Sequence, residues 1–257
     1  HQFTFIARSF IAFFIFSLGT GALYIFNDIF DLEGDREHPV KKHRPIASGR
    51  VSVKAGWIFF FVLGTFSLIM SFLFDLKFGL IIFVYFLLQV CYTLVLKKIV
   101  IVDVFVISFS FILRVIAGAL AIDVDISNWI LICTMLLALF LALSKRRHEL
   151  ILLNDNADEH RIILKEYSPY LLDQMISVVT SATLVAYMIF TLSEETTAKF
   201  GRMVFTVPFV LYGIFRYLYL VHIKEKGGEP EELLLTDIPL QIDILLYGLV
   251  ALAVIYL

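Results

Sequence analysis

The sequence predicts an all-α, polytopic membrane helix bundle, and two observations lead to that prediction. Hydrophobic residues make up 60% of the 257 positions, aromatic residues make up 15%, and the mean hydropathy is +0.89. These values lie well outside the range of soluble domains. The apolar residues are also gathered into long stretches of about 20 residues, the length of helix that crosses roughly 30 Å of hydrocarbon.

Eight such stretches are present. They are too long and too continuously apolar for barrel strands, which alternate over about ten residues, so each is expected to be a helix that satisfies its own backbone hydrogen bonds. The expected spans cover residues 4–29, 51–73, 77–96, 101–121, 127–144, 169–193, 203–222 and 237–257.

The charged residues between the spans set their orientation. Loops 30–50, 97–100, 145–168 and 223–236 share one side and hold fourteen Lys and Arg residues, whereas the opposite loops hold only three. This imbalance predicts a protein integral to the cytoplasmic membrane, with its long polar loops facing the cytoplasm. The fourteen are Arg36, Lys41, Lys42, Arg44, Arg50, Lys97, Lys98, Lys145, Arg146, Arg147, Arg161, Lys165, Lys224 and Lys226, and the three are Lys77, Lys199 and Arg202.

The first span runs into a cluster of carboxylates in the stretch "NDIFDLEGDREH". On a helix that advances about 100° per residue, Asp28, Asp31 and Asp35 share one narrow stripe, and Asn27 lies beside it. Like charges this close raise one another's pKa unless cations neutralise them, and oxygen ligands on a helix end suit Mg²⁺. Since Mg²⁺ keeps waters and bridges to substrate phosphates, the spacing indicates a diphosphate site; the alternative is a solvated helix end whose acids pair with nearby bases.

Basic residues follow the acids directly, in the loop "REHPVKKHRPIASGR". Bases in this place can grip phosphate oxygens while the acids hold a metal. Arg44, held between His43 and Pro45, is the better candidate for a directed contact. Lys42 is a second candidate, although it fits a topology signal equally well.

The pattern Asn-Asp-x-x-Asp-x-x-x-Asp at the cytoplasmic end of an early span resembles the first aspartate-rich motif of the UbiA-type intramembrane prenyltransferases. The resemblance implies a bundle of nine helices with a cytoplasm-facing cavity, in which Mg²⁺ holds a diphosphate. In that family the motif closes the second span, and here it closes the first. We therefore expect residues 1–257 to form a single domain that lacks its first helix, and the helix from Phe10 to Tyr24 to carry an uncovered apolar groove.

Three further stretches narrow the resemblance, namely "DVFVISFSFILRVIAGA", "LALSKRRHEL" and "GIFRYLYL". Together with the acidic motif they are similar to the decaprenyl-phosphate phosphoribosyltransferases over essentially the whole chain. The resemblance implies a glycosyl transfer from phosphoribosyl diphosphate to a polyprenyl phosphate, with diphosphate released. The metal would be held by Asn27, Asp28, Asp31 and Asp35.

The residues of "SKRRHEL" agree with a phosphoribosyl donor, which presents a diphosphate, a 5-phosphate and two ribose hydroxyls. Lys145 and Glu149 are four residues apart and share a helix face with His148, while Arg146 stands about 100° from Lys145. Lys145 and Arg146 suit phosphate, and Glu149 suits a hydroxyl or a metal-bound water. The alternative is topology-setting charge with an intrahelical Lys–Glu pair, and Arg147 is assigned to it.

Polar residues also occur inside span 101–121, where Asp103, Ser110 and Arg114 share one face. An ionisable group at membrane depth costs about 2.5–3.5 kcal/mol, so these residues should face the bundle interior. Asp103 lies near the cytoplasmic end, within reach of the site. Arg114 lies about 16 Å further along the helix and is expected to be a structural partner.

Three other substrate-binding candidates lie at cytoplasmic helix ends. Tyr92 and Lys97 stand where the superfamily often has a Tyr and a basic pair, although the separation is five positions in place of four. Tyr170 opens span 169–193. A further pair, Arg216 with Asp237, is expected to be structural.

Two rival functions fit part of the sequence. A prenyltransferase that joins a prenyl diphosphate to an aromatic acceptor shares the metal site but gives no use for the "KRRHE" cluster. An ion-coupled transporter favours broken helices and midplane sites, whereas these acids sit at one surface. Nucleic acid is not an expected partner, and the sequence leaves open the isoprenoid length, the stereochemistry at C1, the number of Mg²⁺ ions and the oligomeric state.

Overall fold

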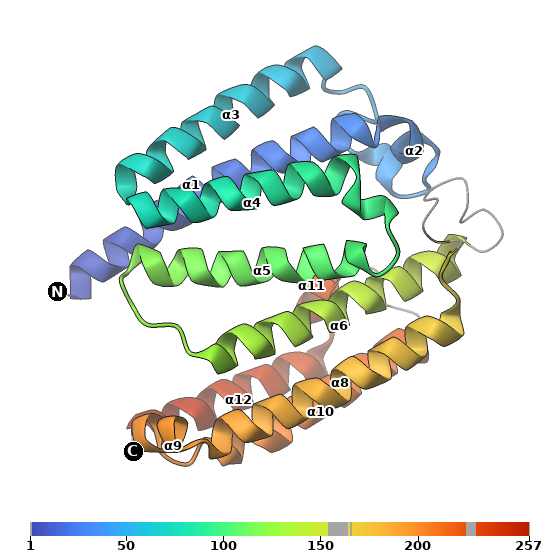
Figure 1. Ribbon diagram of the computed structural model, residues 1–257. Helices are drawn as coiled ribbons and strands as arrows, with labels where there is room; N and C mark the ends of the chain where they lie inside the picture. The colour runs from blue at the N-terminus through green and yellow to red at the C-terminus, as the bar shows by residue number, and fades with distance from the viewer. Residues whose placement is uncertain (1, 154–163, 165, 225–229, 257) are drawn as a thin grey trace. The chain divides into compact units, whose positions relative to one another are not determined.

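The computed structural model describes residues 2–153, 164, 166–224 and 230–256, which form helices and connecting turns without a strand. The chain divides into two compact units, one of residues 1–126 with 155–166 and the other of residues 127–154 with 167–257. Eight of the described helical segments are long and apolar enough to cross a membrane, which confirms the predicted class of fold (Figure 1).

Within the described residues, the segment up to residue 126 of the first unit contains five helices and two 3₁₀ turns. They are α1 (Gln2–Phe30), α2 (Leu32–Glu37), η1 (Lys41–His43), α3 (Val53–Phe74), α4 (Leu76–Leu94), η2 (Leu96–Lys98) and α5 (Val102–Ala121). Helix α1 packs against α3 and α4, and α4 also packs against α5. The buried residues Phe78, Ile82 and Tyr85 of α4 form the centre of this core.

Small residues allow α1, α3 and α4 to approach closely. A Cβ atom on Gly19 would lie 2.6 Å from Ser67 Oγ and 2.8 Å from the Phe86 ring, so a larger residue at this point of α1 would force these side chains to move. Ser67 Oγ donates to the Ile15 carbonyl at 2.8 Å, which satisfies its hydroxyl inside the bundle. Close packing of small residues replaces the hydrophobic driving force that lipid cannot supply.

The second unit contains α6 (Asn128–Leu153), α8 (Pro169–Leu192), α9 (Glu194–Phe200), η5 (Met203–Thr206), α10 (Val207–His222), α11 (Pro230–Thr236) and α12 (Ile238–Tyr256). Helix α6 packs against α8, and α10 packs against α12. A chain of hydroxyls ties this unit together, since Tyr187 Oη lies 2.6 Å from Thr206 Oγ1 and donates to Tyr247 Oη at 3.2 Å.

The predicted spans match the observed ones closely, with two differences. Helix α6 continues to Leu153 rather than ending at residue 144, because "KRRHEL" consists of residues that a helix accommodates well. The loop expected between the second and third spans is reduced to Asp75, and Lys77 therefore lies in the first turn of α4. Asp75 makes this turn possible, since its Oδ1 accepts the Phe78 amide at 2.9 Å and caps the new helix.

The outer surfaces of both units are apolar. Large hydrophobic side chains such as Phe14, Leu73 and Leu245 are more than half exposed, which a lipid environment explains and water does not. The protein is therefore an integral membrane protein. The single domain and the ninth helix stay predictions.

Candidate active site

The acidic motif, which comprises Asn27, Asp28, Asp31 and Asp35, lies where α1 passes into α2. The helical hydrogen bonds continue through the junction, because the Asp31 amide donates to the Asn27 carbonyl at 2.9 Å and the Asp35 amide donates to the Asp31 carbonyl at 2.8 Å. The four side chains therefore keep the near-helical spacing that the sequence predicts.

One guanidinium nitrogen bridges two carboxylates of the motif. Arg44 Nη1 donates to Asp28 Oδ1 at 2.9 Å and to Asp35 Oδ2 at 2.8 Å. Asp35 is 4% exposed, and this burial raises the pKa of its carboxyl, while the Arg44 charge opposes the rise. Arg44 thus contacts two of the carboxylates that the sequence predicts as ligands of a metal ion.

The loop after α2 holds Arg44 in this place. His38 Nδ1 accepts the amides of Val40 and Lys41 at 3.1 and 3.2 Å, which turns the chain, and the Arg44 amide donates to the Lys41 carbonyl at 2.9 Å. Arg50 Nη2 donates to the His43 carbonyl at 2.6 Å and closes the loop from its far side. The guanidinium of Arg44 is therefore directed at the motif by several local contacts.

A second cation serves the remaining carboxylate. Lys97 Nζ forms an ion pair with Asp31 and also lies 3.4 Å from Asn27 Oδ1. Asn27 Nδ2 donates to Asp31 Oδ2 at 3.0 Å, and Thr93 Oγ1 donates to Asn27 Oδ1 at 3.3 Å. Arg44 and Lys97 therefore contact the three carboxylates of the motif, and the charge of Lys41 also acts on Asp28 and Asp35.

The oxygen set suits a hard divalent cation, although its oxygens do not converge on one point. Across the described part of the chain, no group of three or more His, Cys, Asp or Glu side chains is arranged to hold a metal ion. The ligand atoms available at the motif are carboxylate and amide oxygens, which Mg²⁺ prefers. These residues fit Mg²⁺ by chemistry, and Arg44 and Lys97 are the cations that contact its expected ligands.

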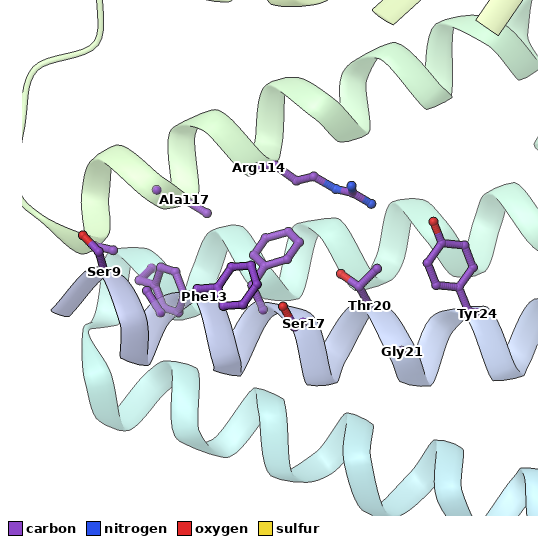
Figure 2. Close-up of a pocket in the computed structure, with 13 residues that line it drawn as sticks. Ser9, Phe13, Ser17, Thr20, Gly21, Tyr24, Arg114 and Ala117 are labelled. Atoms are coloured by element: carbon purple, nitrogen blue, oxygen red, sulfur yellow. The ribbon is translucent and has the colours of Figure 1, made fainter. Parts of the chain in front are cut away.

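A groove of about 530 Å³ runs along the first unit between α1 and α5 (Figure 2). Its lining is mostly apolar and includes Phe13, Phe16 and Ala117, with Arg114 reaching into it. A smaller cavity of about 120 Å³ shares Thr20, Tyr24 and Arg114 with the groove and ends at the motif. The other residues that line this cavity are Leu23, Asn27, Tyr85, Gln89, Tyr92 and Thr93.

Within the first unit, the acidic motif, the smaller cavity and the apolar groove therefore follow one another in space. The profile of the UbiA prenyltransferase family matches residues 2–234. The chain belongs to this family. It is therefore a transferase of the UbiA superfamily, and the predicted relationship is confirmed.

Curated relatives support the narrower resemblance as well. The decaprenyl-phosphate phosphoribosyltransferase of Corynebacterium glutamicum is 34% identical over 237 residues, which cover 90% of this chain and 71% of that protein. The enzyme of the same name from Mycobacterium tuberculosis is 32% identical over 232 residues, covering 90% of this chain and 76% of that protein.

Solved structures of similar fold come from a UbiA homolog of Archaeoglobus fulgidus. The structure bound to GPP and Mg²⁺ has a TM-score of 0.73 at 16% identity, covering 97% of this chain and 88% of that one. The structure bound to DMAPP and Mg²⁺ also has a TM-score of 0.73, covering 96% and 87%. At this identity the likeness establishes the UbiA fold.

The other predicted residues in the first unit of this UbiA protein lie at the smaller cavity, in the buried interior or at the surface. Tyr92 lines the smaller cavity, and Asp103 is fully buried in the first turn of α5. Lys42 is exposed, and no side-chain contact of it is found among the described residues. The sequence did not single out Thr93, which lies in the last turn of α4, just before the η2 turn that carries Lys97, and donates to Asn27.

The "KRRHE" cluster lies on α6 in the second unit. Arg146 Nη1 donates to Glu149 Oε2 at 2.7 Å, and both side chains are buried. The intrahelical pair of the alternative interpretation is therefore formed by Arg146 rather than by Lys145. Within the described residues, Lys145 has no ion-pair partner.

Other polar residues of the second unit are paired with one another. Arg147 Nε donates to Asp173 Oδ1 at 2.5 Å, and His222 Nε2 lies 3.2 Å from the same oxygen. Arg216 and Asp237 form a two-point ion pair at 3.0 and 2.8 Å, which confirms the structural pairing predicted for them. Tyr170 is 74% exposed at the start of α8. The predicted loop cations Arg161, Lys165 and Lys226 lie outside the described residues.

Proposed function

We propose that the protein transfers the 5-phosphoribosyl group of phosphoribosyl diphosphate to a polyprenyl phosphate and releases diphosphate. The observation that carries this proposal is the sequence of environments in the first unit. An oxygen-rich motif with two cations opens into a polar cavity, and that cavity joins an apolar groove. The names of the curated relatives support the same reaction.

The donor diphosphate belongs at the acidic motif. Asp28 and Asp31, with Asn27 and Asp35, would hold Mg²⁺, which supplies a Lewis acid that neutralises charge on the departing diphosphate. Arg44 and Lys97 contact the same carboxylates and are placed to bind diphosphate oxygens. The oxygen ligands of the motif favour a divalent cation, and Arg44 and Lys97 favour the anion that accompanies it.

The transfer breaks the bond between C1 of the ribose and the diphosphate oxygen, and it forms a bond between C1 and an oxygen of the acceptor phosphate. The departing diphosphate leaves an oxocarbenium-like centre, and the nearby cations stabilise the charge that develops on the leaving group. The attacking phosphate is already ionised at neutral pH, so no strong general base is needed. Tyr92, Gln89 and Thr93 line the cavity beside the motif and offer hydrogen bonds to ribose hydroxyls.

We further propose that the protein lies in the inner membrane with this site facing the cytoplasm. The basic loop around Arg44 supports that orientation by the positive-inside rule. A Ser48→Cys variant tests it, because Ser48 is exposed in the same loop. A membrane-impermeant thiol reagent should label this cysteine from the cytoplasmic side only, and labelling in intact cells from outside would contradict the orientation.

The reaction is tested with purified protein, radiolabelled phosphoribosyl diphosphate and polyprenyl phosphate, with and without Mg²⁺. We expect label to enter the lipid fraction only when both substrates and the metal are present. In a parallel reaction, a prenyl diphosphate is offered with an aromatic acid. Prenylation of the aromatic acid, without transfer of phosphoribose, would favour the rival prenyltransferase function and contradict the proposal.

A further inference from the structure

Arg114 is a cation inside a membrane span whose contacts leave its charge uncompensated. Its Nη2 donates to Tyr85 Oη at 2.8 Å, and its guanidinium lies 5.1, 5.6 and 5.9 Å from the ring centres of Phe111, Tyr85 and Phe16. Its buried Nε finds no acceptor, and no carboxylate pairs with it in the described part of the chain. The hydroxyl of Thr20, on the facing helix, is likewise buried without a partner.

An intramembrane arginine is costly, and such residues as a rule pair with an anion or line a functional cavity. The three aromatic rings provide cation–π attraction, which is a sufficient reason for a purely structural arginine to stay in place. They do not explain why the Nε donor has no acceptor, since leaving a buried N–H without a partner is costly. An anionic ligand would satisfy both the charge and this donor.

The cavities around Arg114 define the shape of that ligand. On one side lies the apolar groove of about 530 Å³, bordered by Phe13 and Ala117, which suits a hydrocarbon chain. On the other side lies the polar cavity that ends at Asn27 of the acidic motif. Figure 2 shows the Arg114 side chain extending from α5 to the part of the groove between Thr20 and Tyr24, at the junction of the two cavities.

We propose that Arg114 binds the phosphate of the polyprenyl phosphate acceptor, with the isoprenoid chain along the α1–α5 groove and the phosphate facing the cavity that leads to Asn27. This inference rests on the proposed function, because it assigns the acceptor to a place beside the donor site. Thr20 supplies a second hydrogen bond to the same phosphate. Arg114 is then a substrate-binding residue rather than the structural partner that the sequence predicted.

The test compares two ligands that differ only in the head group, farnesyl phosphate and farnesol, by calorimetry in detergent micelles. In the unmodified protein the phosphate should bind more tightly than the alcohol. Arg114→Gln should raise the Kd of farnesyl phosphate roughly ten- to hundredfold, the range of a hydrogen bond to a charged group, and leave the Kd of farnesol nearly unchanged. Arg114→Lys should retain most of the preference because it keeps the charge.

Arg8→Gln is the matched control. Arg8 precedes Ser9, which lines the groove, and its Nε already donates to the Ala121 carbonyl at 2.8 Å, so its loss should not alter the phosphate preference. Replacing either arginine removes a charge from the membrane, so both variants should still insert. The midpoint of thermal unfolding and the Kd for phosphoribosyl diphosphate in Mg²⁺ show whether each variant is folded.

The outcomes separate the two proposals. If Arg114→Gln loses the same affinity for farnesyl phosphate and for farnesol, or loses affinity for neither, the assignment of Arg114 is overturned. The proposed function would still hold if the unmodified protein transfers phosphoribose. An unmodified protein that binds farnesyl phosphate through Arg114 but transfers no phosphoribose would uphold the phosphate site and refute the function. Absence of any phosphate preference in the unmodified protein would refute the site.

Discussion

The two clusters of charge in this protein differ in how their carboxylates are paired. In the acidic motif of the first unit, one nitrogen of Arg44 serves both Asp28 and Asp35, and Lys97 contacts Asp31. On α6 and α8 of the second unit, Arg146 pairs with Glu149 and Arg147 pairs with Asp173. Carboxylates that share one cation are prepared to take a metal ion as well, whereas a carboxylate with a guanidinium partner of its own mainly stabilises the fold.

The strongest test of this contrast removes one negative charge from the acidic motif. Asp28→Asn or Asp31→Asn should lower turnover at least a thousandfold, about 4 kcal/mol, because each residue is a proposed ligand of the metal. The control is Asp75→Asn, since Asp75 caps α4 away from the motif and asparagine caps equally well. Turnover near the normal value in either motif variant, at saturating Mg²⁺, would refute the assignment.

The next test removes a negative charge from a matched pair. Glu149→Gln removes the charge of the carboxylate that contacts the buried Arg146, so we expect a loss of about 3 kcal/mol in stability. Thermal unfolding in detergent measures this loss. If Glu149 instead acts on substrate as the sequence suggests, the variant would keep a normal melting temperature and lose turnover, and the contrast between the clusters would fail.

The sequence could predict the fold because hydrocarbon thickness and uncompensated charge impose strict patterns. The spans, the near-helical stripe of Asp28, Asp31 and Asp35, and the Arg216–Asp237 pair follow from such patterns. The partners of the basic residues could not be predicted in the same way. Glu149 is three residues from Arg146 and four residues from Lys145, and a helix permits a pair at either spacing. Side-chain rotamers and burial decide which of the two pairs forms.

Contacts between residues far apart in the chain could not be predicted from the sequence either. Lys97 meets Asp31 across 66 positions, and Arg114 finds Tyr85 and the rings around it through the packing of α1, α4 and α5. The sequence correctly placed Arg114 on a polar helix face, but it gave no sign that the face borders a groove. That groove is formed by residues of α1 and α5 that are small or apolar and so carry no chemical signal of their own.

A smaller effect is expected at Lys145, the cation of the second cluster without an ion-pair partner among the described residues. If it binds the 5-phosphate of the donor, Lys145→Ala should weaken phosphoribosyl diphosphate binding by roughly 1.5–3 kcal/mol and leave free diphosphate binding nearly unchanged. Calorimetry with both ligands makes the comparison. Equal losses would mean that Lys145 acts on diphosphate, and no loss would assign it to membrane topology.

The smallest expected effect concerns Arg44, the cation that bridges Asp28 and Asp35 in the acidic motif. Arg44 Nη1 contacts the oxygens of Asp28 and Asp35 that a metal would use, so the guanidinium and a divalent ion compete for them. Arg44→Gln should therefore tighten binding of Mn²⁺ alone by about tenfold, or 1.4 kcal/mol, and weaken binding of diphosphate, which loses a cation. Electron paramagnetic resonance of Mn²⁺ measures the first effect without any turnover.

Arg50→Gln is the control for this last prediction, because Arg50 lies in the same loop and bonds the His43 carbonyl rather than a carboxylate. It removes the same charge from the loop and should leave Mn²⁺ binding near the unmodified value. If both variants tighten Mn²⁺ binding equally, the effect comes from the general charge of the loop. If Arg44→Gln weakens Mn²⁺ binding, Arg44 organises the carboxylates for the metal instead of competing with it, and the shared nitrogen is then part of the metal site's support.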